Sequence, residues 1–523
     1  MNFLRISFLK NLSLLNYLLI FSFFIYSIYI IRYQYDGHHI GLVYSNAIDF
    51  INGRLPYKEI FIQYGFLTTL IHSLILSIFE NKVFFISFFN VFFYMVGVLL
   101  ISKSVNNLID QKYALLSSII ILFNHPIPWL PWSNYLAFFF ITISLYFLTK
   151  KEKKFFFISF FISLSFLCRQ DLITPILISS IFFFMFYIIG KNRVISKNFF
   201  SLILGFLLPI LLFFIYLFFT NLLEYWLKYI IIPKYYLEIY DTSIIYLISN
   251  FIIYFSTESF FNFIYKPQHL IISIILIFKS ILIFLKIFNK IKIQNNIFFI
   301  VLLSTFLSSS SLRIELFRLF TSVIIGLIPL LYFISKISNK ELKHNLRLLV
   351  LLPAIYCFVF YPMGNNDQFK KIVFNSSKTV IKNHKFDYYK WPDNQVNTIN
   401  LISKLYDKCN VEYLENLTFD SLLSTVNDYN RIRLLPYEKA KDKNSNFHIY
   451  IDKIKNPNNN FIELINKEIN KQNIILLVSE NNNIYKNDKI KVSSFYNKIE
   501  FNQSDIIGRP KILSIYLPFK CYY

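Results

Sequence analysis

Long runs of hydrophobic residues fill the first 362 positions of the chain, and short polar segments separate them. The first run, 11–31, follows two basic residues and precedes no small-residue cleavage site, so it predicts an uncleaved membrane anchor. Segment 66–79 is too short to cross a bilayer and is typical of an interfacial helix. Further spans are predicted at 83–102, 113–123, 135–149, 155–167, 172–189, 199–220, 269–287, 296–310, 317–335 and 348–360. The pattern therefore predicts a mainly α, polytopic membrane protein with about 11 transmembrane helices.

The pattern changes at position 363, where Asn, Lys and Asp become frequent. Short apolar runs at 447–451, 474–478 and 512–517 alternate with helix-like stretches at 396–406 and 461–470. This alternation predicts a small α/β domain over 363–523, after a membrane domain over 1–362. Cys409 and Cys521 both fall in this domain, and the sequence leaves open whether they pair.

Composition supports the membrane assignment. Hydrophobic residues make up 55% of the chain, and only 16% of the residues are charged. A soluble protein of 523 residues needs more polar surface than this. Four cysteines in the whole chain exclude a disulfide scaffold.

The net charge of +23 is distributed unevenly. If the N-terminus is cytoplasmic, the cytoplasmic segments of the membrane domain hold eighteen Lys and Arg residues and the outer segments hold ten. This bias is typical of an inner-membrane protein in that orientation, with the outer loop 32–65 and domain 363–523 in the periplasm. The excess charge indicates topology and contact with membrane lipids, and no nucleic-acid partner is predicted.

The outer loop 32–65 contains the first candidate for chemistry. Asp36 lies a few residues beyond the end of the first span, followed by His38 and His39. Partial desolvation at such a place raises the pKa of a carboxylate and makes it a better general base. The alternative is a solvated aspartate at the interface.

Two other outer segments contain clusters of charge. Arg169 and Asp171 interrupt the otherwise apolar run 155–189, and Arg313, Glu315 and Arg318 lie between two later spans. Guanidinium groups at these places are suited to gripping a phosphate with two parallel hydrogen bonds. The alternative is that these arginines extend to lipid headgroups.

No cofactor is predicted. His38 and His39 are adjacent, so they cannot both face one metal ion without a kink, and Asp36 with one histidine makes only a partial site. His125 lies among prolines and tryptophans that are typical of an interfacial loop. No phosphate-binding glycine loop, dinucleotide fingerprint or nucleophile elbow occurs in a fitting context.

Several short elements together resemble the membrane-embedded GT-C glycosyltransferases, the group of the protein mannosyltransferases and aminoarabinose transferases. They are the acidic residue after the first span, the G-x-x-x-Y element ending at Tyr57, the Tyr64-Gly65 pair, and the fragments FLCRQDLITP and LRIELFRL. The resemblance covers about 1–330. Here a single Asp36 replaces the paired acids of several members, so the resemblance does not fix the base or the metal dependence.

The resemblance implies an enzyme that transfers a sugar from a polyprenyl-phosphate-linked donor to a glycan, lipid or protein acceptor in the periplasm. Asp36 is then the catalytic base. The implied substrate-binding residues are His38, His39, Tyr57, Tyr64, Arg169, Asp171, Arg313, Glu315 and Arg318. Two alternatives stay open: a transporter or flippase of a lipid-linked saccharide, and a scaffold without catalysis that displays the C-terminal domain.

Overall fold

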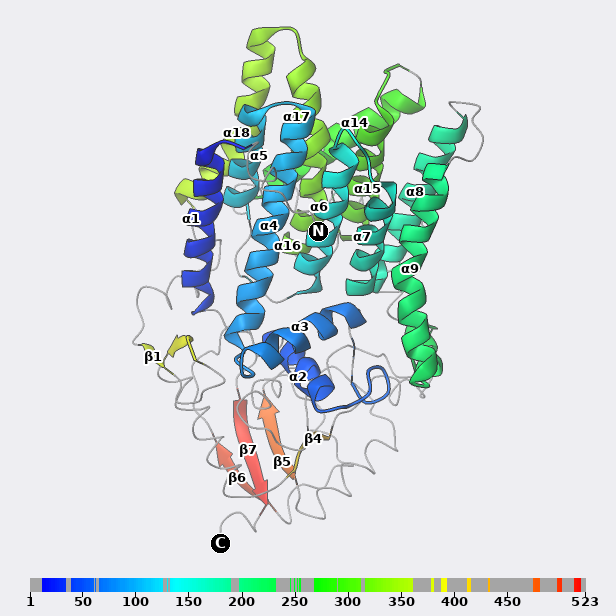
Figure 1. The fold of residues 1–523 in the computed structure, drawn as a ribbon. Coiled ribbons are helices and arrows are strands. Elements are labelled where there is room, and N and C mark those ends of the chain that lie inside the picture. The colour runs from blue at the N-terminus through cyan, green and yellow to red at the C-terminus, as the bar shows by residue number, and fades with distance from the viewer. Residues whose placement is uncertain are drawn as a thin grey trace.

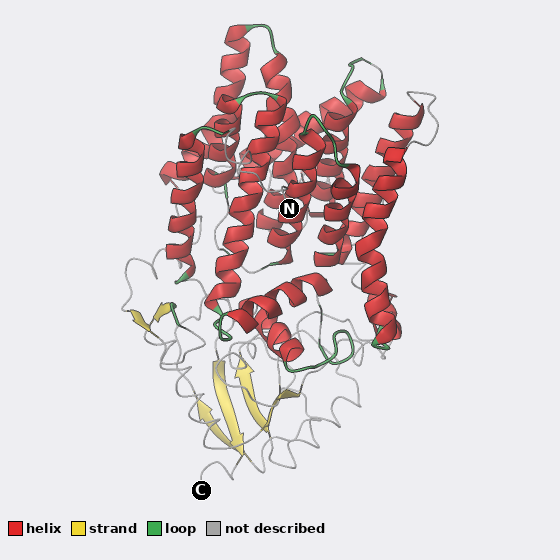
Figure 2. Ribbon diagram, in the orientation of Figure 1, coloured by secondary structure: helices red, strands yellow, loops and turns green. Residues whose placement is uncertain are grey.

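The computed structural model describes residues 12–33, 39–60, 62, 65–125, 129, 132–189, 197–231, 245, 249, 252, 254, 268–288, 290–311, 316–360, 378–380, 387–392, 412–414, 431–432, 474–479, 496–500 and 512–518. The fold is mainly helical, and the strands lie at one end of the helical bundle (Figures 1 and 2). The helices are α1 (Leu14–Ile31), α2 (His39–Ile51), α3 (Phe66–Ile78), α4 (Phe84–Leu108), α5 (Gln111–Phe123), α6 (Ser133–Thr149), α7 (Phe155–Cys168), η2 (Gln170–Leu172), α8 (Ile173–Ile189), α9 (Lys197–Phe219), α10 (Leu223–Ile231), α14 (Gln268–Ile287), α15 (Asn295–Ser311), α16 (Leu316–Val323), η4 (Ile324–Gly326), α17 (Leu327–Lys336) and α18 (Lys340–Phe360).

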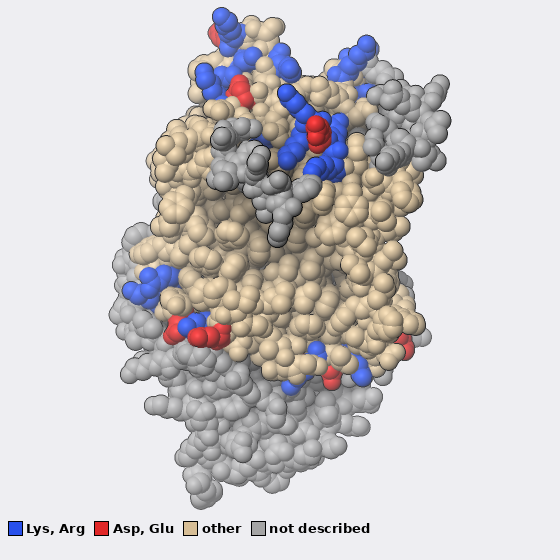
Figure 3. Space-filling model, in the orientation of Figure 1, with Lys and Arg blue, Asp and Glu red and all other residues tan. Residues whose placement is uncertain are grey.

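Six helical segments of the described chain are long and apolar enough to cross a membrane. They are Leu14–Ile31, Phe84–Leu108, Phe199–Phe219, Gln268–Ile287, Arg318–Lys336 and Lys340–Val359. On the face seen in Figure 3, the described Lys and Arg residues lie toward the two ends of the molecule, and most lie at the end away from the strands. The broad band between the ends shows no charged side chain among the described residues of this face. Such a band is what a hydrocarbon layer requires of a protein surface.

Helices α2 and α3 lie across the end of the bundle instead of along it (Figure 1). They pack against each other, and Ser73 of α3 donates to the Ala47 carbonyl of α2 at 3.1 Å. Segment 66–79, predicted to form an interfacial helix, is thus helical over Phe66–Ile78. The start of α3 contacts the end of α7, because Thr68 Oγ1 donates to the Cys168 carbonyl at 3.1 Å. Gly65 permits this approach: a Cβ there would lie 2.2 Å from the Leu167 carbonyl oxygen.

The strands of the C-terminal region form two sheets. A five-stranded mixed sheet has the order β4-β3-β5-β7-β6, in which β4, β3 and β5 are parallel and β7 is antiparallel to both β5 and β6. The bounds are β3 (Glu412–Leu414), β4 (Arg431–Ile432), β5 (Ile474–Ser479), β6 (Tyr496–Glu500) and β7 (Ile512–Pro518), with the separate pair β1 (Lys378–Val380) and β2 (Lys390–Pro392). Two of the predicted apolar runs lie in β5 and β7. The run 447–451, the helix-like stretches 396–406 and 461–470, and both Cys409 and Cys521 lie outside the described residues.

The residues around β2 attach to the bundle at the end of α1 and the start of α4. Lys390 N–H donates to the Arg32 carbonyl at 2.8 Å, and Arg32 Nε donates to the Tyr388 carbonyl at 3.0 Å. Tyr389 is fully buried, with its ring 5.9 Å from that of Phe84. Lys82 and Asp387 add an ion pair at 3.4 Å. A short segment of the polar region is therefore tied directly to the membrane helices.

Candidate functional site

Arg169 lies where α7 ends and the chain turns into α8. Its backbone is extended, with φ −143° and ψ 105°, and the one-turn helix η2 follows. The apolar run 155–189 is thus divided into two helices at the charged residues, as the sequence pattern suggested. The Arg169 side chain is 3% exposed. It does not extend to solvent or headgroups, so the lipid-contact alternative does not fit this residue.

The Arg169 guanidinium is held by two partners. Its Nε donates to Oδ1 of Asp171 at 2.9 Å, and Nη2 pairs with the other oxygen of the same carboxylate. Its Nη1 donates to Oδ1 of Asn134, in the first turn of α6. Two parallel bonds to a carboxylate fix the plane of a guanidinium, and the third bond fixes how far it reaches. Arg169 is therefore preorganised against the start of α6.

Two buried side-chain donors lie at the N-terminus of α6. Trp132 precedes the helix and provides no side-chain cap. In the described part of the chain, Oγ of Ser133 and Nδ2 of Asn134 are buried without a hydrogen-bond partner. Buried polar groups of this kind cost free energy unless something binds them. Together with the first backbone N–H groups of a helix, they form a site that favours an anion.

Arg318 approaches the same helix end from α16. It is 5% exposed, and its guanidinium carbon lies 4.5 Å from the centre of the Trp132 ring. Two guanidinium groups thus contact the N-terminus of α6. Arg169, at the end of α7, contacts Asn134, and Arg318 of α16 contacts Trp132. As for Arg169, burial argues against an arginine that extends to lipid headgroups.

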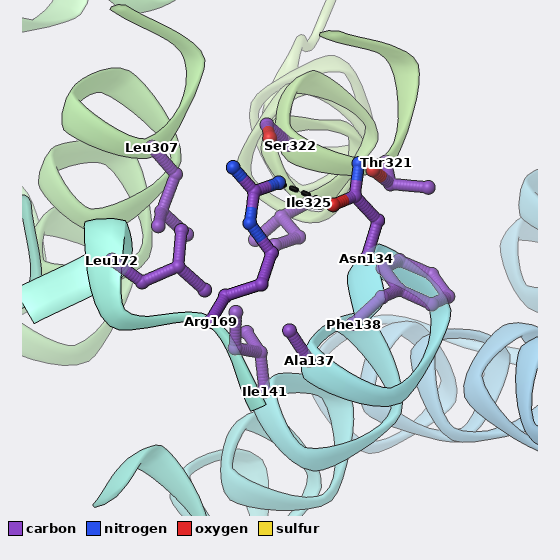
Figure 4. Close-up of a pocket in the computed structure, with 10 residues that line it drawn as sticks. All are labelled: Asn134, Ala137, Phe138, Ile141, Arg169, Leu172, Leu307, Thr321, Ser322 and Ile325. Carbon is purple, nitrogen blue, oxygen red and sulfur yellow. Dashed lines mark hydrogen bonds between the residues drawn. The ribbon is translucent and has the colours of Figure 1, made fainter. Parts of the chain in front are cut away.

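A cavity lies between these elements (Figure 4). Arg169 and Asn134 meet there, Thr321 of α16 lies beside Asn134, and Ser322 of α16 lies near the tip of the Arg169 guanidinium. The other lining residues are Ala137, Phe138, Ile141, Leu172, Leu307 and Ile325. Its volume of about 20 Å³ is room for about one water molecule. A larger ligand therefore requires the lining elements to move apart.

Two residues of the outer loop that carry the GT-C resemblance, Tyr57 and Gly65, contact the chain next to Arg169. Tyr57 is fully buried, and its hydroxyl accepts a hydrogen bond of 3.0 Å from Nε2 of Gln170, the residue after Arg169. Burial raises the pKa of Tyr57 well above its ordinary value, so the phenol stays neutral. Gly65 fits against the carbonyls of Leu167 and Cys168, directly before Arg169. Segments about 100 residues apart in sequence thus meet at one helix end.

The other predicted site residues lie outside this description. Asp36, His38, Tyr64, Arg313 and Glu315 are outside the described residues, and His39 begins α2 with a side chain that is also outside them. The structure therefore brings together Tyr57, Arg169, Asp171 and Arg318 from the predicted set. Among the described residues, no group of three or more His, Cys, Asp or Glu is arranged to hold a metal ion.

The structure adds residues that the sequence analysis missed. Trp132, Ser133 and Asn134 complete the site, and Gln170 links it to Tyr57. A signal was present in the sequence, since a Ser-Asn pair that opens an apolar run is typical of a helix start. Nothing in that signal indicates which arginine approaches it.

His125 lies in the non-helical segment between α5 and α6, and its side chain packs inside the protein. Its ring is buried and stacks on Trp129 at 3.9 Å, and Nε2 lies 3.2 Å from the Tyr135 hydroxyl. Burial lowers the pKa of His125 to about 3. His125 is thus a neutral core histidine at the end of α5. His72 of α3 is similar, because burial lowers its pKa to about 3 and Asn90 is its neighbour at 3.3 Å.

Comparison with protein-family models and with curated protein sequences finds no match to this chain. The function is therefore inferred from the residues and their geometry.

Proposed function

We propose that this protein is a membrane-embedded glycosyltransferase that uses a polyprenyl-phosphate-linked sugar as donor. The observation that supports it best is the convergence of Arg169 and Arg318 on the N-terminus of α6, beside the unpartnered donors of Ser133 and Asn134. Two guanidinium groups, one of them paired with Asp171, and two unpartnered neutral donors at one buried helix N-terminus suit the phosphate of a lipid carrier. Such preorganised charge stabilises a departing phosphate most strongly where water is excluded.

The proposal includes a topology. Eleven helical segments cross the inner membrane, and α2 and α3 lie at its outer surface. The crossing segments are α1, α4, α5, α6, α7, α8, α9, α14, α15, α16 to α17 taken together, and α18. The N-terminus is then cytoplasmic, and the site and the C-terminal α/β domain face the periplasm. The acceptor, a glycan, lipid or protein, approaches from that side.

The proposed reaction has two roles. Asp36 takes the proton from the acceptor hydroxyl while the acceptor oxygen forms a bond to the anomeric carbon of the donor sugar. The bond from that carbon to the phosphate oxygen breaks, and Arg169 and Arg318 stabilise the negative charge on the departing phosphate. His38, His39, Tyr64, Arg313 and Glu315 contact the substrates. Tyr57 and Asp171 act at the same corner through Gln170 and Arg169.

One observation favours transport of a lipid-linked saccharide instead. The segment Arg318–Lys336 is interrupted by η4, and discontinuous helices at a binding site are common in transporters. The two proposals differ in what they require of Asp36, because transport needs no base.

The deciding experiment uses purified protein in liposomes with a panel of polyprenyl-phosphate-linked sugars and acceptors. We expect transfer by the wild type and a loss of about 10²- to 10⁴-fold in Asp36→Asn. The matched control is Glu59→Gln in the same loop, because the Glu59 carboxylate accepts the Leu55 N–H at 2.7 Å and an amide oxygen can do the same. Asp49 is a poorer control, since it is buried and pairs with Arg54 at 3.7 Å. Carrier movement without transfer by any variant would favour the transporter.

A further inference from the structure

Lys279 is a fully buried lysine in the middle of the membrane-spanning helix α14. None of the described carboxylates pairs with it. Its Nζ instead donates to three oxygens of α15: the Ser304 carbonyl at 3.0 Å, Ser304 Oγ at 3.1 Å and Ser308 Oγ at 2.8 Å. A charge at this depth is costly and usually marks a functional position.

The same serine reaches the break in the next segment. Ser304 Oγ lies 3.3 Å from the Val323 carbonyl and 3.5 Å from the Ser322 carbonyl, where α16 gives way to η4. The Ser304 hydroxyl therefore connects Lys279 to the backbone at the junction of α16 and η4. Gly326, at the end of η4, leaves room for the lysine, because a Cβ there would lie 2.9 Å from Lys279 Cδ.

This network and the cavity share Ser322. Ser322 and Ile325, on either side of the break, both line the cavity that holds Arg169 and Asn134. Ser322 Oγ also bonds Ser311 Oγ of α15 at 3.1 Å. The side of the cavity that α16 and η4 form is therefore positioned by the hydrogen bonds between the α16–η4 junction and α15.

We propose that Lys279 acts as a tethered cation that fixes the α16–η4 break to α15 and thereby positions the α16 wall of the anion cavity. Its Nζ is surrounded by three oxygens of α15. Lys279 is a positioning residue in this role, since it acts on the cavity through Ser304 and Ser322. The lysine site itself does not depend on the proposed transferase function, whereas its effect on lipid-phosphate binding does.

The test removes the Lys279 ammonium group by substitution and then supplies a free ammonium ion of matching size. Lys279→Met keeps an apolar stem without donors, and Lys279→Ala leaves a space that matches propylammonium in the atoms removed. We expect both variants to lose several degrees in Tm in detergent. Propylammonium should restore Tm in Lys279→Ala, whereas 1-propanol, which lacks the charge, should not. Lys286→Ala on the same helix is the matched control and should neither lose Tm nor respond.

A second measurement tests positioning. Farnesyl phosphate serves as the probe, and its affinity should fall in Lys279→Ala and recover with propylammonium. Wild-type Tm in Lys279→Met, or no rescue specific to propylammonium, would overturn the tethered cation. A lower Tm with unchanged probe affinity would overturn the positioning role. If the wild type binds no farnesyl phosphate, the lipid-phosphate assignment fails, while the Tm rescue still decides the role of Lys279.

Discussion

Arg169 donates through Nη1 to Oδ1 of Asn134, a residue 35 positions earlier in the chain. The bond joins the end of α7 to the start of α6, at the place where Arg318 covers Trp132. Asn134 is therefore oriented with its carbonyl toward Arg169 and its amide N–H groups left for another acceptor. In this orientation the N-terminus of α6 offers hydrogen-bond donors to a ligand, and a substitution at Asn134 can test whether an anion binds there.

Asn134→Asp should keep the bond to Arg169 but place a carboxylate where an anion is proposed to bind. We expect the variant to fold with a Tm near that of the wild type and to bind farnesyl phosphate at least tenfold more weakly, since one lost charge-assisted bond costs about 1.5–3 kcal/mol. Asn339→Asp, at the exposed start of α18, introduces the same charge and should change nothing, because a carboxylate can also accept the Leu342 N–H that Asn339 Oδ1 accepts at 3.0 Å. Unchanged affinity in Asn134→Asp would remove the α6 N-terminus from the site.

Arg318→Lys keeps the charge of the side chain and loses its planar guanidinium. The stack on Trp132 needs that plane, so we expect weaker probe binding together with a small loss of stability, on the order of 1 kcal/mol. Isothermal titration with farnesyl phosphate measures the first effect and thermal unfolding the second. Arg54→Lys is the control, because its ion pair is partly exposed. Wild-type affinity in Arg318→Lys would mean that this residue only packs.

Gly65→Ala should be severely destabilising. The added Cβ would lie 2.2 Å from the Leu167 carbonyl oxygen, which belongs to the backbone and cannot rotate away. Gly53→Ala is a matched comparison in the same loop: nothing lies within 4 Å of the new Cβ, but φ is +82°. We expect it to cost only about 1 kcal/mol from backbone strain. Equal Tm values for the two variants would contradict the contact between α3 and α7.

Acid should destabilise the protein through His72 and His125. Burial lowers the pKa of both to about 3 from an ordinary 6.5. Below pH 6.5 the unfolded chain takes up protons that the folded protein excludes, so stability falls as pH drops from about 6.5 toward 3. At pH 5 the loss is about 2 kcal/mol for each histidine.

The measurement compares Tm at pH 7.5 and pH 5 in the same detergent. His125→Gln should narrow the difference between the two values, because the replacement cannot take up a proton. His344→Gln, at an exposed position of α18, should leave the difference unchanged. A wild-type Tm that does not fall at pH 5 would show that these rings are not buried as neutral groups.

Reporter fusions test the orientation. The charge distribution predicts a cytoplasmic N-terminus and a periplasmic C-terminal domain. Alkaline phosphatase fused after Tyr523 should be active, whereas a fusion in the turn between α17 and α18 should be inactive. That turn is a suitable control because it precedes α18 and contains Ile337 to Asn339 without helical structure. Activity only in the turn fusion would place the site on the cytoplasmic side.

The sequence by itself predicted the positions of most long apolar helices, but not α2, which lies within the predicted outer loop 32–65. Apolar runs flanked by polar residues predict their positions, because a helix end in or near a membrane needs polar neighbours. The break at Arg169 was visible for the same local reason, since charges interrupt the run 155–189. The predicted span 317–335 does not show its interruption at η4, because Ile324 and Ile325 are as apolar as the helices around them.

The tertiary structure alone decided which residues share a site. In a membrane helix the side that faces lipid and the side that faces protein are both apolar, so hydrophobic periodicity does not identify the packed face. The contacts of Arg169 with Asn134 and of Lys279 with Ser304 join different helices, and no local pattern encodes them. They follow from how the helices pack, where each buried polar group must find a partner within the bundle because the surrounding layer offers none.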